Sequence, residues 1–425
     1  MERSKYSTII ALDFGTTYSG YAYLSKSKFT RNPLKIHVNQ AWKSGYRQFL
    51  TLKTPTCVLL DIKKEFKCFG YDAENEYGDK CMDDIYNDYY FFRGFNIKKN
   101  TTSDLMLKDV TGKTLPASHV FTMFIKAFVY HITEESDKKD ASFKKDETRW
   151  VIIVSVELTD TSKQTLRSCA EQAGIPLGQL ILVTEAEATF AYCQRFMHRN
   201  NNQHTQEGTD YMVFDIGGSV ADITVIKKVT DGIIEKYRRT GNDCGGTAIN
   251  MKFLDLLNSI FGKSVMQSLK KEAPDAYLAF IRECEQIKRK VKGSQDKIEM
   301  RVPYACLNNI CLKIRDESFL NVISTSKYSN DIILMGDSLR IEADIVHTLF
   351  KTTINKIIAL MEDIFTEHKD SFNVEAIVMI GGLSECMLVQ EAVRQRFFRK
   401  NVIVPKDACL AIVKVAILCG SQSCQ

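Results

Sequence analysis

The chain contains one short pattern twice, about two hundred residues apart. Residues 8–13 are an apolar run that ends in an acid, a Phe-Gly-Thr-Thr turn follows, and residues 19–24 are rich in β-forming side chains. The second copy has an apolar run over 211–214, the turn Asp-Ile-Gly-Gly-Ser over 215–219, and a β-rich run over 222–229. Each copy predicts a strand, a glycine turn and a second strand. Two such hairpins at this separation predict an internally duplicated architecture.

Strand and helix patterns alternate along the rest of the chain, which predicts an α/β fold. Buried strands are expected over 148–156, 180–183 and 375–380, and helices over 161–173, 185–198, 249–261, 274–292, 338–366, 389–398 and 408–418. The polar segment 198–210 is expected to be an exposed loop, and we place the boundary between two lobes there.

Length and composition agree with a two-lobed globular protein. The 425 residues exceed the roughly 250–300 at which a single core stops growing. A net charge of +5 is mild and does not indicate a nucleic-acid partner. No apolar run is long enough to predict a membrane span, and residues 1–7 lack the apolar core of a signal peptide. The thirteen cysteines lack zinc-site spacing, so we expect reduced, buried thiols and a cytoplasmic location.

The first turn has the composition of a phosphate site. Gly15 allows the backbone to approach a phosphate closely, and consecutive N–H groups in such a turn form a concave anion site. Thr16 and Thr17 add hydroxyl donors. Asp13, at the strand end, offers carboxylate oxygens to the waters of a Mg²⁺ ion. A glycine hairpin after a strand-end acid is also a common structural turn, so one copy alone leaves both interpretations open.

The second turn favours the phosphate interpretation, because two such turns can hold a phosphate chain from two sides. Its predicted contacts are Gly217, Gly218 and Ser219. Asp215 precedes the turn as a further magnesium ligand through water, and Asp222 adds a third carboxylate.

Two further glycine pairs are candidate nucleotide contacts. Gly381 and Gly382 follow the predicted strand 375–380, where bare backbone allows adenosine to lie against the chain, although close packing of a helix on a strand would explain them as well. Gly245 and Gly246, which precede the predicted helix 249–261, are the other pair of candidate nucleotide contacts.

Taken in order, the motifs at 13–20, 215–218 and 380–382 resemble the ATPase domain of the heat-shock-70 family. Finer strings resemble its divergent protein 12 branch, at 53–56, 69–73, 149–152, 185–188 and 405–407. The resemblance covers essentially the whole chain. It implies a duplicated ribonuclease-H-like core, as in actin, with two lobes around a central cleft for ATP or ADP and Mg²⁺.

The resemblance also implies a division of the chain. Lobe I would span 1–206 with an inserted subdomain at about 35–115, lobe II would span 207–404 with an insert at about 230–325, and 405–425 would return to lobe I. The sequence ends soon after the ATPase pattern, so we expect no peptide-binding domain.

Residue roles follow from the resemblance. Asp13 would be the first metal-binding acid, Glu185 would support the magnesium shell, and Asp215 would orient or deprotonate the attacking water. Asp222 matches the second acid of the second phosphate motif.

A charged helix would contact adenosine in that family. Glu285, Lys288 and Arg289 are the matching residues here. A solvated helix face is the alternative, because glutamate and lysine three residues apart often pair on helix surfaces.

The departures from the family pattern lie where the chemistry occurs. Ser219 replaces a glycine, Val220 replaces a threonine, and Ser155 replaces a proline proposed to relay the nucleotide state. The active-site lysine of the family falls within 89–99. Arg93 or Gly94 lies near its place, with Lys98 or Lys99 a turn beyond, and the sequence leaves the choice open.

These features predict an ATP-binding regulator or chaperone-like stress-response protein, with unidentified protein partners and slow or absent hydrolysis. Losing one group that stabilises the transition state costs about 10²–10³ in rate. A small-molecule phosphotransferase, a nucleotide-free scaffold and an actin-like filament former are the alternatives. The basic runs at 144–145 and 394–400 are expected to be solvated faces.

Overall fold

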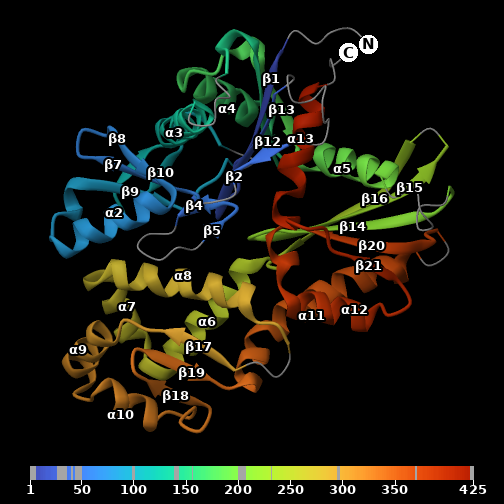
Figure 1. The fold of residues 1–425 in the computed structure, drawn as a ribbon. Helices are drawn as coiled ribbons and strands as arrows, with labels where there is room; N and C mark the ends of the chain where they lie inside the picture. Colours follow the sequence, from blue (N-terminus) through green and yellow to red (C-terminus); the bar gives the residue numbers. More distant parts are fainter. Residues whose placement is uncertain are drawn as a thin grey trace. The chain divides into compact units, whose positions relative to one another are not determined.

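A computed structural model describes residues 6–25, 36–39, 42–43, 50–97, 101–137, 143–155, 157–199, 207–230, 232–293, 297–368 and 371–421. The chain divides into two compact units. Unit 1 comprises residues 1–199 and 410–425, and unit 2 comprises residues 200–409. Each unit has its own central sheet (Figure 1).

The central sheet of unit 1 has the strand order β13-β12-β1-β2-β3. The strands are β1 (Thr8–Asp13), β2 (Tyr18–Ser25), β3 (His37–Val38), β12 (Thr148–Val154) and β13 (Leu180–Thr184). β1 pairs antiparallel with β2 on one side and parallel with β12 on the other, and β12 continues parallel to β13. A short strand, β6 (Thr54–Pro55), pairs with the start of β2.

The central sheet of unit 2 repeats this scheme strand for strand, in the order β16-β15-β14-β20-β21. The strands are β14 (Asp210–Ile216), β15 (Val220–Val229), β16 (Gly232–Asn242), β20 (Val374–Ile380) and β21 (Asn401–Ile403). The β14–β15 hairpin is antiparallel, while β14, β20 and β21 run parallel. The duplicated α/β architecture predicted from the two hairpins is confirmed.

Helices cover the sheet of unit 1. They are α3 (Ala117–Asp137), α4 (Asp160–Gln172), α5 (Glu185–Arg199) and α13 (Ala411–Ser421). α13 comes from the end of the sequence and packs on β1, β2 and β12 beside α5 (Figure 1). A Cβ atom at Gly420 would lie 2.8 Å from side chains of Ile9 and Val151, so this glycine allows α13 its close approach to the sheet.

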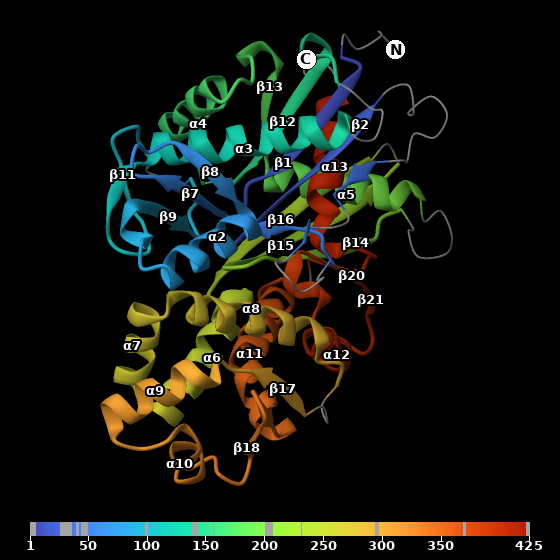
Figure 2. The same cartoon turned by 60° about the vertical axis from the view of Figure 1, so that its left-hand side comes forward.

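Each unit also carries inserted elements. In unit 1, β7 (Cys57–Asp61), β8 (Phe66–Phe69) and β9 (Tyr89–Arg93) form a sheet against which α2 (Gly70–Met82) packs (Figure 2). Unit 1 also contains two two-stranded sheets, one of β4 (Trp42–Lys43) and β5 (Leu50–Thr51) and one of β10 (Met106–Lys108) and β11 (Thr114–Pro116). Unit 2 inserts α7 (Lys263–Glu272), α8 (Pro274–Lys290), β17 (Ile298–Arg301), α9 (Tyr304–Arg315), α10 (Phe319–Ser324), β18 (Ile332–Met335) and β19 (Ser338–Ile341) after α6 (Gly246–Phe261).

One predicted helix was wrong at its start. Residues 338–341 form β19, and the helix α11 (Ala343–Glu367) begins only afterwards. Leu339 and Ile341 are buried while Ser338 and Arg340 are half-buried, which is the two-residue alternation of a strand. β19 pairs with β17 on one side and β18 on the other, so strand pairing decides its conformation.

Smaller differences occur elsewhere. Residues 408–410, expected in the last helix, form a separate 3₁₀ turn. Most of the predicted loop 198–210 lies outside the described residues. Among the residues that are described, no helix is both long and apolar enough to cross a membrane. The described cysteines form no disulfide and are buried or half-buried.

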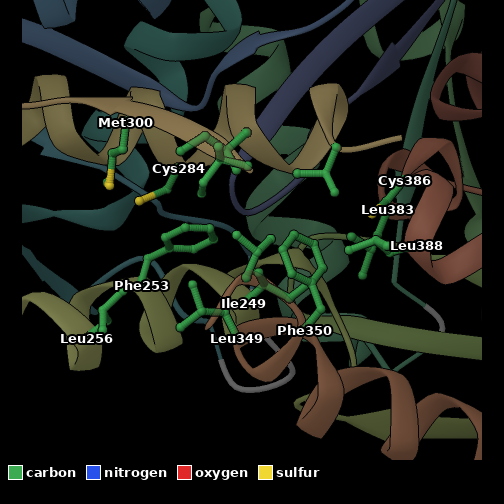
Figure 3. Close-up of a cluster of buried hydrophobic side chains, with 14 of the residues drawn as sticks. Ile249, Phe253, Leu256, Cys284, Met300, Leu349, Phe350, Leu383, Cys386 and Leu388 are labelled. Atoms are coloured by element: carbon green, nitrogen blue, oxygen red, sulfur yellow. The ribbon is translucent and has the colours of Figure 1, made fainter. Parts of the chain in front are cut away.

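The core of unit 2 joins the inserted helices to the central fold. Figure 3 shows Phe253 of α6 next to Cys284 of α8, and Ile249 of α6 next to Phe350 of α11. Phe253 and Phe350 meet edge to face, with ring centroids 6.2 Å apart. This cluster therefore fixes α6 and α8 relative to each other.

We expect Phe253→Ala to lower the free energy of unfolding by about 3–5 kcal/mol, because it leaves a cavity in a fully buried cluster. Met251→Ala is the control, since Met251 lies on the same helix and is 57% exposed. Denaturant unfolding of both variants is the measurement. Equal midpoints for the two would contradict this account of the core.

Candidate functional site

The first glycine turn, residues 14–17, joins the neighbouring strands β1 and β2 of the unit 1 sheet. A Cβ atom at Gly15 would lie 2.4 Å from the carbonyl oxygen of Tyr18, so only glycine fits this turn. Phe14 anchors the turn to the core, with its ring edge to face against Phe95 at 5.9 Å and Phe121 at 5.8 Å. The turn is therefore a close-packed part of the fold.

Side chains from other segments hold this turn in shape. The hydroxyl of Thr56 donates to the carbonyl oxygen of Gly15 at 2.6 Å, and its backbone N–H donates to that of Thr17 at 2.9 Å. The side-chain amide of Asn96 donates to the hydroxyl of Thr16 at 3.2 Å. The predicted phosphate loop is thus preorganised by unit 1 alone.

Asp13, the predicted magnesium ligand before the turn, is ion-paired. The Nζ atom of Lys53 lies 2.5 Å from its Oδ2 atom, and the two side chains are 18% and 16% exposed. In the sequence, Lys53 belongs to the string at 53–56 that carries the resemblance, and this string assigns it no role. The signal that could have identified it is the pairing of β6 with β2, which requires tertiary structure.

The second turn, residues 217–219, joins β14 to β15 in unit 2. Asp215 and Asp222 are directly opposite each other in this antiparallel ladder. Opposite residues share one face of a sheet with Cβ atoms about 4.5–5.5 Å apart, and like charges there repel. Asp222 also accepts a hydrogen bond from the hydroxyl of Thr240 on β16. Two carboxylates on one face are a donor set that suits the hydration shell of Mg²⁺.

The start of α6 supports the second turn. The N–H of Gly246 donates to the carbonyl oxygen of Gly217 at 3.2 Å. The N–H and hydroxyl of Thr247 both donate to the carbonyl oxygen of Gly218, at 2.8 and 2.7 Å. A Cβ atom at Gly245 would lie 2.4 Å from that same oxygen. Gly245 and Gly246 therefore lie directly against the second glycine turn.

Gly381 also lies directly against the strand-end acid. Its φ angle is +87°, and a Cβ atom there would lie 2.2 Å from Oδ1 of Asp215 and 2.6 Å from the carbonyl oxygen of Ile216. Gly382 is exposed, with no atom within 4 Å of an added Cβ atom. The structure therefore shows close packing at Gly381 and open space at Gly382.

The residues of α8 predicted to contact adenosine differ in burial. Lys288 is buried and donates to Glu285 at 2.8 Å and to the carbonyl oxygen of Gly246 at 2.9 Å. Asn250 donates to the same Glu285 carboxylate at 2.5 Å. Burial alone would raise the pKa of Glu285, but Lys288 and Asn250 outweigh it and hold that pKa below its usual 4.5. A solvated helix face, the alternative in the sequence analysis, is excluded for Glu285 and Lys288, while Arg289 is exposed.

Glu185 is the first residue of α5 and is half-buried. A capping box fixes this position, because the N–H of Thr184 donates to Glu187 at 2.7 Å and the N–H of Glu187 donates back to the hydroxyl of Thr184 at 3.1 Å. Glu185 thus follows β13 at a rigid helix start.

Arg93, a candidate for the place of the active-site lysine, is committed to another contact. Its Nε atom donates to the fully buried carboxylate of Glu74 at 2.8 Å. Burial disfavours the charged guanidinium, but Glu74 outweighs this and raises the pKa of Arg93. Gly94 supplies no side chain, and Lys98 and Lys99 lie outside the described residues.

The residues that depart from the family pattern differ in their exposure and contacts. Ser219 is exposed at the second turn, and Val220 is half-buried at the start of β15. The hydroxyl of Ser155 accepts a hydrogen bond from the N–H of Glu157 at 3.4 Å, just after β12. Among the described residues, no group of three or more His, Cys, Asp or Glu side chains that could hold a metal ion is found.

Each unit therefore brings part of the predicted site together. Unit 1 groups Asp13 with the turn at 14–17. Unit 2 groups Asp215, Asp222 and the second turn with the glycine pairs and with Lys288.

The two central sheets have the same strand order, and each has a glycine turn after an acid at the end of a strand. These features define the actin-like ATPase fold. A family model described as "Hsp70 protein" matches residues 71–424, and the chain belongs to this family. Within it, the chain is 29% identical to human "Heat shock 70 kDa protein 12A", over 99% of this chain and 70% of that protein. It is 27% identical to human "Heat shock 70 kDa protein 12B", over 99% of this chain and 69% of that protein. It is 21% identical to "Chaperone protein DnaK" of Thermotoga neapolitana, over 60% of this chain and 39% of that protein. The resemblance to the protein 12 branch is confirmed.

Gly381→Ala tests the close packing against Asp215. Gly174 is the matched control, because its φ angle of +96° is similar but an added Cβ atom meets nothing within 4 Å. Both substitutions incur the roughly 1–2 kcal/mol cost of a left-handed alanine. We expect Gly381→Ala to lose about 1–3 kcal/mol more in denaturant unfolding, since its Cβ atom displaces a carboxylate and a carbonyl group. Equal losses would show that the backbone at 381 does not lie against Asp215.

The lowered pKa of Glu285 predicts a pH dependence. A carboxyl group whose pKa falls on folding stabilises the folded state above its unfolded pKa, and that contribution is lost as the pH falls through the folded value. We therefore expect Glu285→Gln to lose less stability than the wild type when the pH is lowered below about 4.5. Thermal unfolding between neutral and acidic pH measures this. Glu171→Gln, at an exposed position, is the control, and a Glu285→Gln curve parallel to the wild type would refute the prediction.

Proposed function

We propose that this chain binds ATP or ADP together with Mg²⁺, and that it acts as a nucleotide-dependent regulator or chaperone-like binder of partner proteins. The observation that carries the proposal is the repeated site: a glycine turn follows a strand-end acid at the same place in two equivalent sheets. Members of the Hsp70 family normally bind nucleotide with magnesium, which supports the proposal.

Each unit carries residues suited to part of this chemistry. The turn at 14–17 would bind phosphate through backbone N–H groups and threonine hydroxyls. Asp13 in unit 1, and Asp215 and Asp222 in unit 2, would offer carboxylate oxygens to the waters of magnesium, and Asp215 would orient the attacking water. Bound magnesium neutralises phosphate charge. Buried Lys288 and half-buried Glu285 would contact the adenosine.

We further propose that hydrolysis is slow. The exposed side chain of Ser219 stands where the family pattern has bare glycine, and Val220 has no hydroxyl to offer a phosphate. Arg93 is held by Glu74 and is not placed to replace a missing lysine. Phosphoryl transfer depends on positioned charge and donors, so these changes lower the rate more than the affinity.

A regulatory output requires that nucleotide binds two conformations of the protein with different affinity. A partner protein would then bind the surface that one of the two conformations exposes. A cytoplasmic location and a role in stress responses stay predictions.

Calorimetric titration with ATP and ADP, with and without Mg²⁺, tests the proposal. We expect Asp215→Asn to weaken magnesium-nucleotide binding at least about tenfold, since it removes a charge that holds the hydrated ion. Denaturant unfolding of Asp215→Asn separates a loss of binding from a loss of folding. Asp255→Asn, on an exposed part of α6, is the control and should bind as the wild type does.

Three outcomes separate the candidate functions. If the wild type binds no nucleotide, the chain is a scaffold and the proposal fails. Single-turnover hydrolysis at a rate typical of the family would contradict slow hydrolysis, because we expect a rate that is lower by about 10²-fold or more. Transfer of the terminal phosphate to an added metabolite, followed by NMR, would identify a phosphotransferase.

A further inference from the structure

Lys53 reaches into the first turn from a segment with no assigned role. It immediately precedes β6, and its Nζ atom lies 2.5 Å from Oδ2 of Asp13. Both side chains are more than four-fifths shielded from solvent. A shielded pair interacts more strongly than an exposed one, because the effective dielectric around it is lower. Lys53 is therefore part of the predicted phosphate site of unit 1.

The fold provides a path for the lysine side chain. Gly20 is the cross-strand partner of Asp13, and a Cβ atom at Gly20 would lie only 3.1 Å from Cγ of Lys53. The stem of Lys53 thus crosses β2 at a position without a side chain and ends at the acid opposite. The hydroxyl of Thr51 donates to the carbonyl oxygen of Lys53 at 2.9 Å and steadies the backbone there.

The same segment also holds the turn itself. Thr54 pairs with Ser19 at the start of β2, and Thr56 donates to the carbonyl oxygens of Gly15 and Thr17. Residues 53–56 therefore place a cation beside Asp13 and fix the loop that would bind phosphate. An ammonium group has three N–H donors and can bind a carboxylate and phosphate oxygens at the same time.

The negative charge of Asp13 indicates what Lys53 would contribute to phosphate binding. Asp13 without a partner repels a polyphosphate, and in a magnesium-dependent site the hydrated metal ion cancels that repulsion. In this protein the ammonium group of Lys53 already neutralises Asp13. Arg93, the other described cation considered for this role, is held by Glu74.

We propose that Lys53 is the phosphate-binding cation of the first turn and shares the Asp13 carboxylate with magnesium, so that the chain also binds nucleotide without metal. This inference rests on the nucleotide binding proposed above and specifies how the unit 1 half of that site works. Lys53 and the hydrated metal ion are then alternative partners of one carboxylate, and the effect of removing one depends on the presence of the other.

Calorimetric titration with ADP, in EDTA and in excess Mg²⁺, tests the proposal on four forms of the protein. These are the wild type, Lys53→Gln, Lys53→Arg and Lys67→Gln. Lys67 is the matched control, because it also pairs with an aspartate of unit 1, Asp61 at 3.0 Å, away from the turn.

We expect Lys53→Gln to weaken metal-free ADP binding about tenfold or more, the usual size of a charged hydrogen-bond loss. In excess magnesium the loss should be smaller, because the metal then neutralises Asp13. Lys53→Arg should retain metal-free binding, and Lys67→Gln should match the wild type in both conditions.

Several results would overturn the inference. A wild type that binds ADP only with magnesium would overturn the inference and leave the proposed function intact. Equal losses of ADP affinity for Lys53→Gln in EDTA and in magnesium would have the same consequence. A wild type that binds no nucleotide in either condition would refute both proposals. If Lys53→Gln does not fold, the double variant Asp13→Asn/Lys53→Gln leaves no uncompensated charge and is titrated instead. Metal-free affinity equal to that of the wild type would then overturn the inference.

Discussion

Each glycine turn depends on a strand that is hydrogen-bonded on both sides. β1 lies between its antiparallel partner β2 and the parallel strand β12, and β14 lies between β15 and β20 in the same way. The strands β1 and β14 are almost fully buried, so a one-residue slip would move buried side chains to the opposite face. The register therefore fixes where each strand ends, and with it the places of Asp13 and Asp215.

Close backbone packing then shapes the turns. Gly15, Gly245 and Gly381 each occupy places where an added Cβ atom would lie within 2.4 Å of another atom. Threonine side chains complete the arrangement, with Thr56 bound to the first turn and Thr247 to the second. Since these contacts come from within each unit, the turns need no ligand to hold their shape, and binding would require little ordering of the chain.

The two turns differ in their charge. The acid of the first turn is neutralised by Lys53, whereas the acid of the second faces another carboxylate, Asp222. The first turn thus combines backbone donors with a cation, which suits phosphate. The second concentrates negative charge on one face, which suits a hydrated metal ion. The two turns of the duplicated fold therefore differ in the chemistry that they offer.

The sequence alone determined the duplicated hairpins, the α/β class and the candidate residues of both turns, because these are local patterns of apolar runs, acids and glycines. It did not predict β19, where pairing with two neighbouring strands outweighs the helical pattern that follows. It also could not show that Lys288 is buried against Gly246, or that Lys53 meets Asp13. Those contacts join residues about 40 positions apart, and only the pairing of strands and the packing of helices bring such residues together.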